Sequence, residues 1–409
     1  MSDKTAQVTD EPVREGPGGR LPFGVYVLGA SVFALGTSEF VVAGLVDQMA
    51  GSLHVSVPRI GQLITAFAIG MLVGAPLMAV LTLGRDRKTV LLAAAAVFCV
   101  AHLLTAVIPD YGVIFVLRIV AAMAAATELT VAQVIAVALA GPGRVPRAIA
   151  VIIGGMTLAN VAGVPIGSLA GAQFNWQIIF VFIGLVSAAG AILVAVYVPR
   201  LPRSHGPEVT LPTLVGRELR SMRQTRIFVA LATTVLFETA LFSVYAYVQP
   251  ILTDASGLSE HQVPIVLFLF GVGMFLGSTV GGRLAQWSLL RNILLSLVAM
   301  IVMMLVLRVV VHNPIAAAAA VTLLGICAFS MTAALSSRVI GFAVGAPTLA
   351  VAIVMSAFNI GNAVGPALGG VVIGRGATAD VIWVGMIVAV AALGTALISA
   401  AMQRRADAG

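Results

Sequence analysis

The chain contains few charged residues. Only 10% of its 409 residues are Asp, Glu, Lys or Arg, whereas 60% are hydrophobic. Soluble domains carry about 25% charged residues, so this composition excludes a water-soluble fold. The net charge of +7 does not indicate nucleic-acid binding, because the basic residues lie in short segments between apolar runs. A lipid bilayer is therefore the solvent that the sequence requires.

Cysteine and motifs for catalysis or metal binding are also scarce. The two cysteines, Cys99 and Cys327, lie within apolar runs, which is typical of buried packing residues rather than of a disulfide. No His or Cys cluster has metal-ligand spacing, and no Gly-Lys-Ser or Gly-Lys-Thr sequence marks a nucleotide site. No nucleophile with its base can be assembled. We therefore expect neither an enzyme nor a cofactor, and no drive by ATP.

Long apolar runs are abundant. The first twenty residues are polar, and the run after them is too long for a signal-peptide core, which indicates a retained first helix. The sequence predicts an all-α membrane protein with twelve transmembrane helices, each of at least 18 residues. These helices are expected at 21–46, 57–81, 89–108, 112–140, 147–171, 177–198, 227–252, 262–284, 291–311, 315–335, 349–374 and 380–402.

One long hydrophilic connection divides the chain. Residues 199–226 hold four prolines and six arginines between two groups of six predicted helices. Basic residues alternate by side: 19 of the 23 lie in the tails and in every second loop, which by the positive-inside rule places both termini in the cytoplasm. We predict a cytoplasmic tail (1–20), a six-helix bundle (21–198), a cytoplasmic linker (199–226), a second bundle (227–402) and a short tail (403–409).

The two groups of helices repeat each other. Phe67, Gly70, Met71 and Gly74 recur 203 positions later as Phe270, Gly273, Met274 and Gly277, and Asn160, Gly163 and Gly167 recur 202 positions later as Asn362, Gly365 and Gly369. Similar offsets in two helix pairs favour duplication, and six helices per copy give parallel repeats. The alternative is convergent packing of small residues, which is common between membrane helices.

Four ionisable residues fall inside predicted spans: Glu39, Arg118, Glu128 and Glu238. A charge near the bilayer centre costs about 3 kcal/mol, so such residues usually have a function. At about 1.5 Å rise per residue, Glu39 and Arg118 lie at the same depth and could pair, whereas Glu128 lies about 15 Å deeper than Arg118. All four are candidates for proton coupling. The alternative is a structural buried network, and nearby threonines could satisfy Glu238.

Neutral polar groups are candidates for binding an uncharged ligand. Thr127, Thr130 and Gln133 lie within about a turn and a half of Glu128. Tyr245 and Tyr247 could line a pocket, although tyrosine near a span end is ordinarily a membrane-interface residue. We predict these five residues as substrate contacts.

The fifth predicted span is rich in glycine and contains a proline. Glycine lets helices approach closely, and proline interrupts the hydrogen-bond ladder, so this segment could act as a sealing hinge. The alternative is a kinked packing helix without a gating role. The candidate hinge residues are Gly155, Asn160, Gly163, Pro165 and Gly167.

Three segments resemble the major facilitator superfamily, in its twelve-helix drug:proton antiporter branch. The sequence Gly36-Thr37-Ser38-Glu39-Phe40 resembles the helix 1 signature of actinobacterial chloramphenicol-resistance efflux proteins and sugar efflux permeases. Leu117-Arg118 is similar to the helix 4 motif, and the stretch ending Gly163-Val164-Pro165-Ile166-Gly167 resembles the antiporter motif with one residue inserted. The loop 84–88 keeps a basic cluster but not the usual aspartate and glycine spacing, and Glu128 has no counterpart in the family pattern.

The resemblance implies a monomeric, proton-coupled exporter of a small hydrophobic antibiotic, such as chloramphenicol, in a bacterial inner membrane. The partners expected are the drug, the proton and the lipid bilayer, without nucleic acid. A first alternative is efflux of a sugar, nucleoside or endogenous metabolite by the same mechanism. A second is a membrane receptor or assembly subunit that transports nothing.

Overall fold

The computed structural model describes residues 21–81, 85–200, 224–342, 347–376 and 378–407, which are helical apart from short turns. Twelve helical segments in this part of the chain are long and apolar enough to cross a membrane, which confirms the predicted twelve-helix all-α fold. The predicted tail 1–20 and most of the predicted linker 199–226 lie outside the described residues.

Several spans are built from more than one helix. The first six spans contain α1 (Phe23–Ser31), α2 (Phe33–Val41), η1 (Val42–Gly44), α4 (Val57–Leu81), α5 (Arg87–Val107), α6 (Tyr111–Ala140), α7 (Val145–Leu158), η3 (Ala159–Gly163), α8 (Val164–Gln173) and α9 (Gln177–Tyr197). The last six contain α11 (Thr225–Tyr245), α13 (Val263–Trp287), α14 (Leu289–Val310), α15 (Pro314–Phe329), α16 (Thr332–Phe342), α17 (Pro347–Ile373), η5 (Thr378–Asp380) and α18 (Val381–Asp407).

Short helices join some of these spans. Outside the first span lies α3 (Val46–Leu53), and α11 is followed by α12 (Val248–Pro250) and η4 (Ile251–Ala255). A single turn, η2 (Pro142–Arg144), precedes α7.

Side-chain caps fix where several spans begin. The Asp86 carboxylate accepts a hydrogen bond from the Thr89 amide at 2.9 Å, and Asp110 accepts one from Val113 at 2.9 Å. Such caps satisfy amide groups that have no partner within the helix. They place the starts of α5 and α6 in the polar turns that precede these apolar runs.

The repeat seen in the sequence extends to helix packing. A side chain at Gly70 on α4 would collide with the Ile119 carbonyl of α6, and one at Gly273 on α13 would collide with the Thr322 carbonyl of α15. The two glycines are 203 positions apart in the sequence, and so are their partners, Ile119 and Thr322. In the same way, a side chain at Gly163 would meet Thr37, and one at Gly365 would meet Thr239. These two glycines, and these two threonines, are 202 positions apart. Equivalent helices therefore make equivalent close contacts in the two halves.

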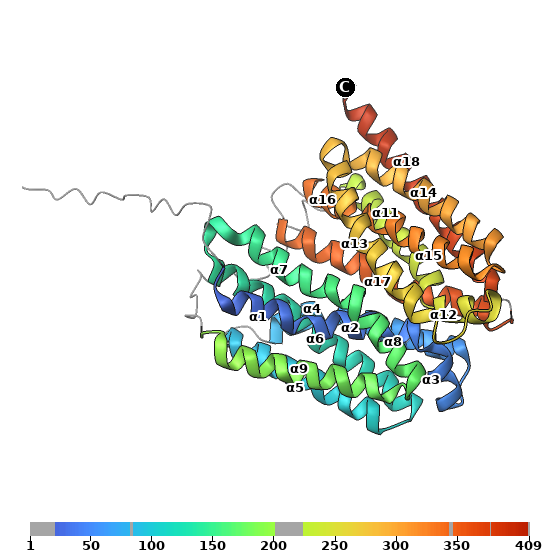
Figure 1. Ribbon diagram of the computed structural model, residues 1–409. Coiled ribbons are helices and arrows are strands. Elements are labelled where there is room, and N and C mark those ends of the chain that lie inside the picture. Colours follow the sequence, from blue (N-terminus) through green and yellow to red (C-terminus); the bar gives the residue numbers. More distant parts are fainter. Residues whose placement is uncertain (1–20, 82–84, 201–223, 343–346, 377, 408–409) are drawn as a thin grey trace, which may run out of the picture.

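The two halves meet along two pairs of spans. Thr65 on α4 donates a hydrogen bond to the Ala363 carbonyl of α17 at 2.8 Å, and Gly271 of α13 packs against the backbone of Asn160 in η3. In Figure 1 the halves converge toward α3 and α12 and diverge toward the first turn of α1 and the last turn of α18. We call these the closed end and the terminal end of the bundle.

Candidate functional site: a buried polar network at the interface of the halves

Arg118 of α6 is fully buried, but its partner is not a carboxylate. Its Nη1 donates hydrogen bonds to the Ser38 carbonyl and to Ser38 Oγ, each at 2.9 Å, and its Nε donates to the Leu63 carbonyl at 3.4 Å. The guanidinium carbon lies 4.2 Å from the centre of the Phe67 ring, a cation–π contact. Its Nη2 has no hydrogen-bond partner among the described residues. One donor of this cation thus remains available to an acceptor.

His102 of α5 extends this network, and the sequence analysis missed it. Its Nε2 lies 2.7 Å from Ser38 Oγ, and its Nδ1 lies 2.8 Å from the Phe98 carbonyl. A carbonyl can only accept, so Nδ1 carries the proton and Nε2 accepts from the Ser38 hydroxyl. The ring packs against Phe98 and Phe180. The hydrogen bonds therefore form a directed chain in which Ser38 links the neutral imidazole to the Arg118 guanidinium.

Glu39, next to Ser38, faces the second half of the protein. Its side chain is half-buried although it lies in the middle of a span, so it retains accessible surface inside the bundle. No ion pair joins Glu39 to Arg118 in the described part of the chain, yet the two charges lie close enough to interact. The charge of Glu39 also acts on Glu238 and Tyr245 of α11. Glu39 is thus the point where charges from both halves meet.

Glu238 is buried where α11 packs on α17, against Gly361. Two of the three nearby threonines are occupied elsewhere: Thr233 is hydrogen-bonded to Thr395 at 2.9 Å, and Thr234 donates to the Ala230 carbonyl at 3.0 Å. The Thr239 hydroxyl is buried without a partner among the described groups. Glu238 is therefore a buried carboxyl without an ion-pair partner in the described chain.

Glu128 is separate from this cluster. It is 2% exposed, lies beside Ser31 of α1, and its Oε2 has no hydrogen-bond partner among the described residues. The structure brings together Glu39, Arg118 and Glu238, whereas Glu128 occupies a different level of the first half.

The predicted substrate-contact residues of α6 are largely engaged by their own helix. Thr127 donates its hydroxyl to the Met123 carbonyl and Thr130 to the Ala126 carbonyl, each at 2.8 Å. Thr127 is buried, Thr130 is exposed and Gln133 is partly exposed. The two hydroxyls can therefore offer only acceptor lone pairs to a ligand.

Tyr245 belongs to an aromatic cluster that spans the interface of the halves. Its ring stacks on Phe270 with centroids 4.8 Å apart and meets Phe242 and Phe40 edge-on at 5.7 and 6.1 Å. Phe329 joins at 6.5 Å from Phe270. Phe40 follows Glu39 in the chain, and Tyr245 lies close enough to interact with the Glu39 charge. We call Phe40, Phe242, Tyr245, Phe270 and Phe329 the aromatic cluster.

Tyr247 is placed differently from Tyr245. Its hydroxyl donates to the Pro366 carbonyl of α17 at 2.7 Å, and its ring is packed against Gly61 of α4 and Gly370 of α17. The side chain is fully buried near the closed end. Its contacts fasten the turn between α11 and α12 to α17 and α4.

The fifth span contains a π-helical segment, η3, between α7 and α8. The Val164 amide bonds to the Ala159 carbonyl, five residues back, immediately before Pro165. A π turn accommodates one extra residue in a helix. In the equivalent span, Pro366 directly follows Gly365 and α17 continues without a π segment. The glycines of the two spans keep the same spacing, so the spans differ in the position of the proline, and the π segment lies where this chain departs from the antiporter motif.

The other candidate hinge residues lie at close contacts between helices. A side chain at Gly155 would meet the Gly29 carbonyl, and one at Gly167 would meet Val41 and Ile179. Asn160 lies within η3, and its carbonyl contacts Gly271 of the second half. This span therefore packs on the first span and on α13 at once.

The closed end is held by hydrogen bonds between the halves. Thr253 Oγ1 donates to Asp47 Oδ2 at 3.1 Å, and the Asp47 amide donates to Gln249 Oε1 at 3.3 Å. Gln48 Nε2 donates to Glu260 Oε2 at 3.1 Å. Burial raises the pKa of Asp47 to about 6; hydrogen bonding by Thr253 opposes this shift, and the charges of Asp254 and Glu260 reinforce it. We call these contacts the closed-end bonds.

A twelve-span helical bundle in which ionisable side chains from both halves meet at the interface defines a polytopic secondary transporter. The chain belongs to the Major Facilitator Superfamily, whose family model matches residues 28–346. It is accordingly a multi-pass membrane transporter of small molecules and not an enzyme.

Two curated relatives cover most of the chain. A chloramphenicol resistance protein of Streptomyces lividans is 35% identical over 380 residues, which is 91% of this chain and 95% of that protein. The inner membrane transport protein YdhP of Escherichia coli is 31% identical over 357 residues, which is 87% and 90% of the two chains.

Solved structures share the fold at lower identity. The nucleoside transporter NupG superposes with a TM-score of 0.73 at 16% identity, covering 93% of this chain and 98% of its own. The peptide transporter POT superposes with a TM-score of 0.70 at 13% identity, covering 94% and 95%.

Proposed function

We propose that this protein exports a small, lipophilic, uncharged antibiotic, chloramphenicol or a relative of it, in exchange for protons. The observation that carries the proposal is the placement of Glu39, which interacts with Arg118 in its own half and with Glu238 across the interface. A carboxyl whose charge interacts with groups in both halves can couple its protonation to their relative motion.

Proton coupling follows because Arg118 and Glu238 act in opposite directions on the charge of Glu39. When Glu39 is deprotonated, its negative charge is attracted to the free Nη2 of Arg118 and repelled by a charged Glu238. When it is protonated, both effects vanish. The halves then rock about the two seams at α4–α17 and α13–η3, and the closed-end bonds break as that end opens. In our proposed topology both termini are cytoplasmic, so the described conformation is closed toward the outside.

The aromatic cluster supports an apolar cargo with a ring. Its rings come from both halves and pack on one another, and Tyr245 lies within reach of the Glu39 charge. When the halves move apart, a flat ligand could stack on these rings while its polar edge reaches the carboxylate. The relative from Streptomyces lividans, named a chloramphenicol resistance protein, agrees with a cargo of this class.

The test uses a drug-sensitive bacterial host and inverted vesicles made from it. We expect the wild type to raise the inhibitory concentration of chloramphenicol and to take up labelled drug into inverted vesicles when a proton gradient is present. Glu39→Gln should abolish gradient-driven uptake, whereas Glu39→Asp should retain part of it because it keeps a carboxyl. Wild type without protection would refute the substrate class, and undiminished uptake by Glu39→Gln would refute the coupling role.

A further inference from the structure

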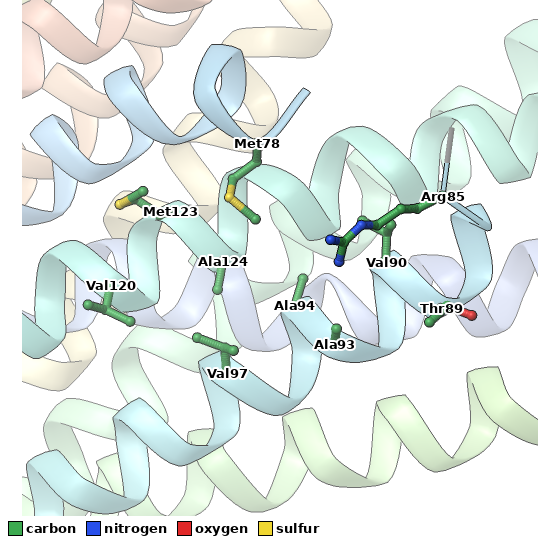
Figure 2. Close-up of a pocket in the computed structure, with 10 residues that line it drawn as sticks. All are labelled: Met78, Arg85, Thr89, Val90, Ala93, Ala94, Val97, Val120, Met123 and Ala124. Carbon is green, nitrogen blue, oxygen red and sulfur yellow. The ribbon is translucent and has the colours of Figure 1, made fainter. Parts of the chain in front are cut away.

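A cavity lies away from the polar network, between α4, α5 and α6. It has a volume of about 350 Å³ and is lined by Met78, Arg85, Thr89, Val90, Ala93, Ala94, Val97, Val120, Met123 and Ala124. All but two of these side chains are apolar. Figure 2 shows the lining residues of α5 and α6 along the crevice, Met78 above them and Arg85 at one end. This volume falls in the range of small-molecule sites.

The crevice opens toward the membrane rather than into the interface of the halves. Val97 and Val120, at the end of the crevice opposite Arg85, are 46% and 37% exposed, and Ala93, nearer Arg85, is exposed as well. All three belong to membrane-spanning segments of the first half. Their exposed surface in the bilayer is therefore available to the hydrocarbon of a lipid.

Among the described lining residues, the polar end of the crevice carries one cation. In Figure 2 the guanidinium of Arg85 is directed toward the lining residues rather than away from them. Arg85 has no hydrogen bond or ion pair with any described residue, whereas the adjacent Asp86 accepts hydrogen bonds from the amide and hydroxyl of Thr89. Lys88, on the next turn, is turned elsewhere and donates to the Ala195 carbonyl at 2.7 Å. The cation that faces the crevice is thus Arg85.

We propose that this crevice binds an anionic phospholipid, with one acyl chain along α5 and α6 and the phosphate on Arg85. An apolar channel that ends in a single guanidinium matches a ligand with a hydrocarbon tail and a negative head. Basic pockets between transmembrane helices are known to select anionic head groups. A zwitterionic lipid adds a second, positive charge next to Arg85, which disfavours it. The site is independent of the proton-coupling role of Glu39.

The experiment measures lipid binding to the full chain purified in a neutral detergent. Dioleoyl phosphatidylglycerol and dioleoyl phosphatidylcholine, which carry the same tails, are titrated separately while the thermal unfolding midpoint is followed. A ligand that binds the folded state raises this midpoint with concentration. We expect phosphatidylglycerol to raise the midpoint at lower concentration than phosphatidylcholine. Glycerol 3-phosphate, the head group without tails, should not raise it.

Two pairs of variants locate the site. Arg85→Gln should weaken the affinity for phosphatidylglycerol about five-fold, the effect of one basic residue at a membrane surface, whereas Arg87→Gln on the same turn should change it less than two-fold. Ala93→Phe fills the crevice and should weaken binding, whereas Ala96→Phe, also exposed on α5 but outside the lining, should not. All four substitutions are at exposed positions. Gel filtration will confirm that each variant is folded.

Three results would overturn the proposal. Equal responses of the wild type to the two lipids would show that the head group is not recognised. Equal losses in Arg85→Gln and Arg87→Gln would show that only the general surface charge attracts the lipid. Unchanged binding in Ala93→Phe would place the acyl chain elsewhere. The first comparison uses only the wild type, so it remains decisive even if a variant fails to fold.

Discussion

Ser38 and His102 are joined by a hydrogen bond of 2.7 Å that links the first span to α5, and the same hydroxyl oxygen accepts a hydrogen bond from Arg118. Three helices of the first half are therefore connected through one serine side chain, next to Glu39. The position of the Arg118 guanidinium depends on this serine, and the orientation of the serine hydroxyl depends on the imidazole.

Replacing His102 should affect coupling more than folding. In His102→Leu, Ser38 loses its acceptor, and we expect gradient-driven drug uptake to fall at least ten-fold, with about 1–3 kcal/mol of stability lost. His102→Gln offers an acceptor at a similar position and should retain more uptake. Uptake in inverted vesicles and thermal unfolding are measured on the same preparations. Equal uptake in the two variants would argue against a role for this hydrogen bond.

Adjacent glycines of α7 provide a matched test of packing. A methyl group at Gly155 meets the Gly29 carbonyl of α1, whereas one at Gly154 meets nothing within 4 Å. We expect Gly155→Ala to destabilise the protein by about 1–3 kcal/mol through overpacking. Gly154→Ala should be neutral or slightly stabilising, because alanine favours helix. The thermal unfolding midpoints of the two variants are compared; similar values would contradict the close approach of α7 and α1.

The two tyrosines near the end of α11 should respond differently to loss of the hydroxyl. Tyr247→Phe removes the 2.7 Å hydrogen bond to the Pro366 carbonyl in a buried site, and we expect it to cost about 1 kcal/mol of stability. Tyr245→Phe should leave stability nearly unchanged, because the ring contacts remain. Tyr245→Ala should raise the drug concentration that gives half-maximal uptake, since it removes the centre of the aromatic cluster. An unchanged value in Tyr245→Ala would exclude this ring from the binding site.

Opening of the closed end should depend on pH through Asp47. Its pKa is raised to about 6 in the closed conformation by burial, with Asp254 and Glu260 reinforcing the shift. In an open, hydrated conformation the pKa should return to the ordinary value of about 3.9. The closed conformation thus binds the proton more tightly, so lowering the pH through 6 favours closure and raising it favours opening.

Spin labels at Ser52 on α3 and Ser259 after η4 will report this opening, with Cys99 and Cys327 replaced by serine. We expect the distance distribution to shift toward longer distances between pH 5 and pH 8. Asp47→Asn should remove most of this shift, because an amide does not titrate in the range. A shift that persists unchanged in Asp47→Asn would assign the pH dependence to another group.

The transmembrane architecture could be predicted because it depends on quantities that are local in the sequence. Hydropathy locates the spans, and the repeat offsets of 202 and 203 positions even anticipate equivalent helix contacts. The rise per residue places Glu39 and Arg118 at the same depth, but depth does not fix the direction in which each side chain points. The structure shows Arg118 turned to Ser38, one residue before Glu39.

Other features left little trace in the sequence. His102 lies in an apolar run, where nothing marks it, and its partner Ser38 is 64 positions away. The closed-end bonds join residues more than 200 positions apart. None of these residues is among the four ionisable residues that the sequence places inside spans. Such contacts arise from the packing of whole helices, so they require the fold to be known first. The residue inserted before Pro165 was visible, but not the π segment that accompanies it.

The closed-end bonds include no ion pair between described residues; they are hydrogen bonds that involve one amide, two glutamines, a threonine and two carboxylates. Each contributes about 0.5–1.5 kcal/mol net, so these bonds add only a few kcal/mol to the packing of Tyr247 that also holds this end shut. A few kcal/mol is also the size of coupling that a ligand typically supplies between two conformers. In the proposed cycle, the difference in affinity of the cargo for the two conformers is therefore enough to offset these bonds, without a change in any ion pair of this end.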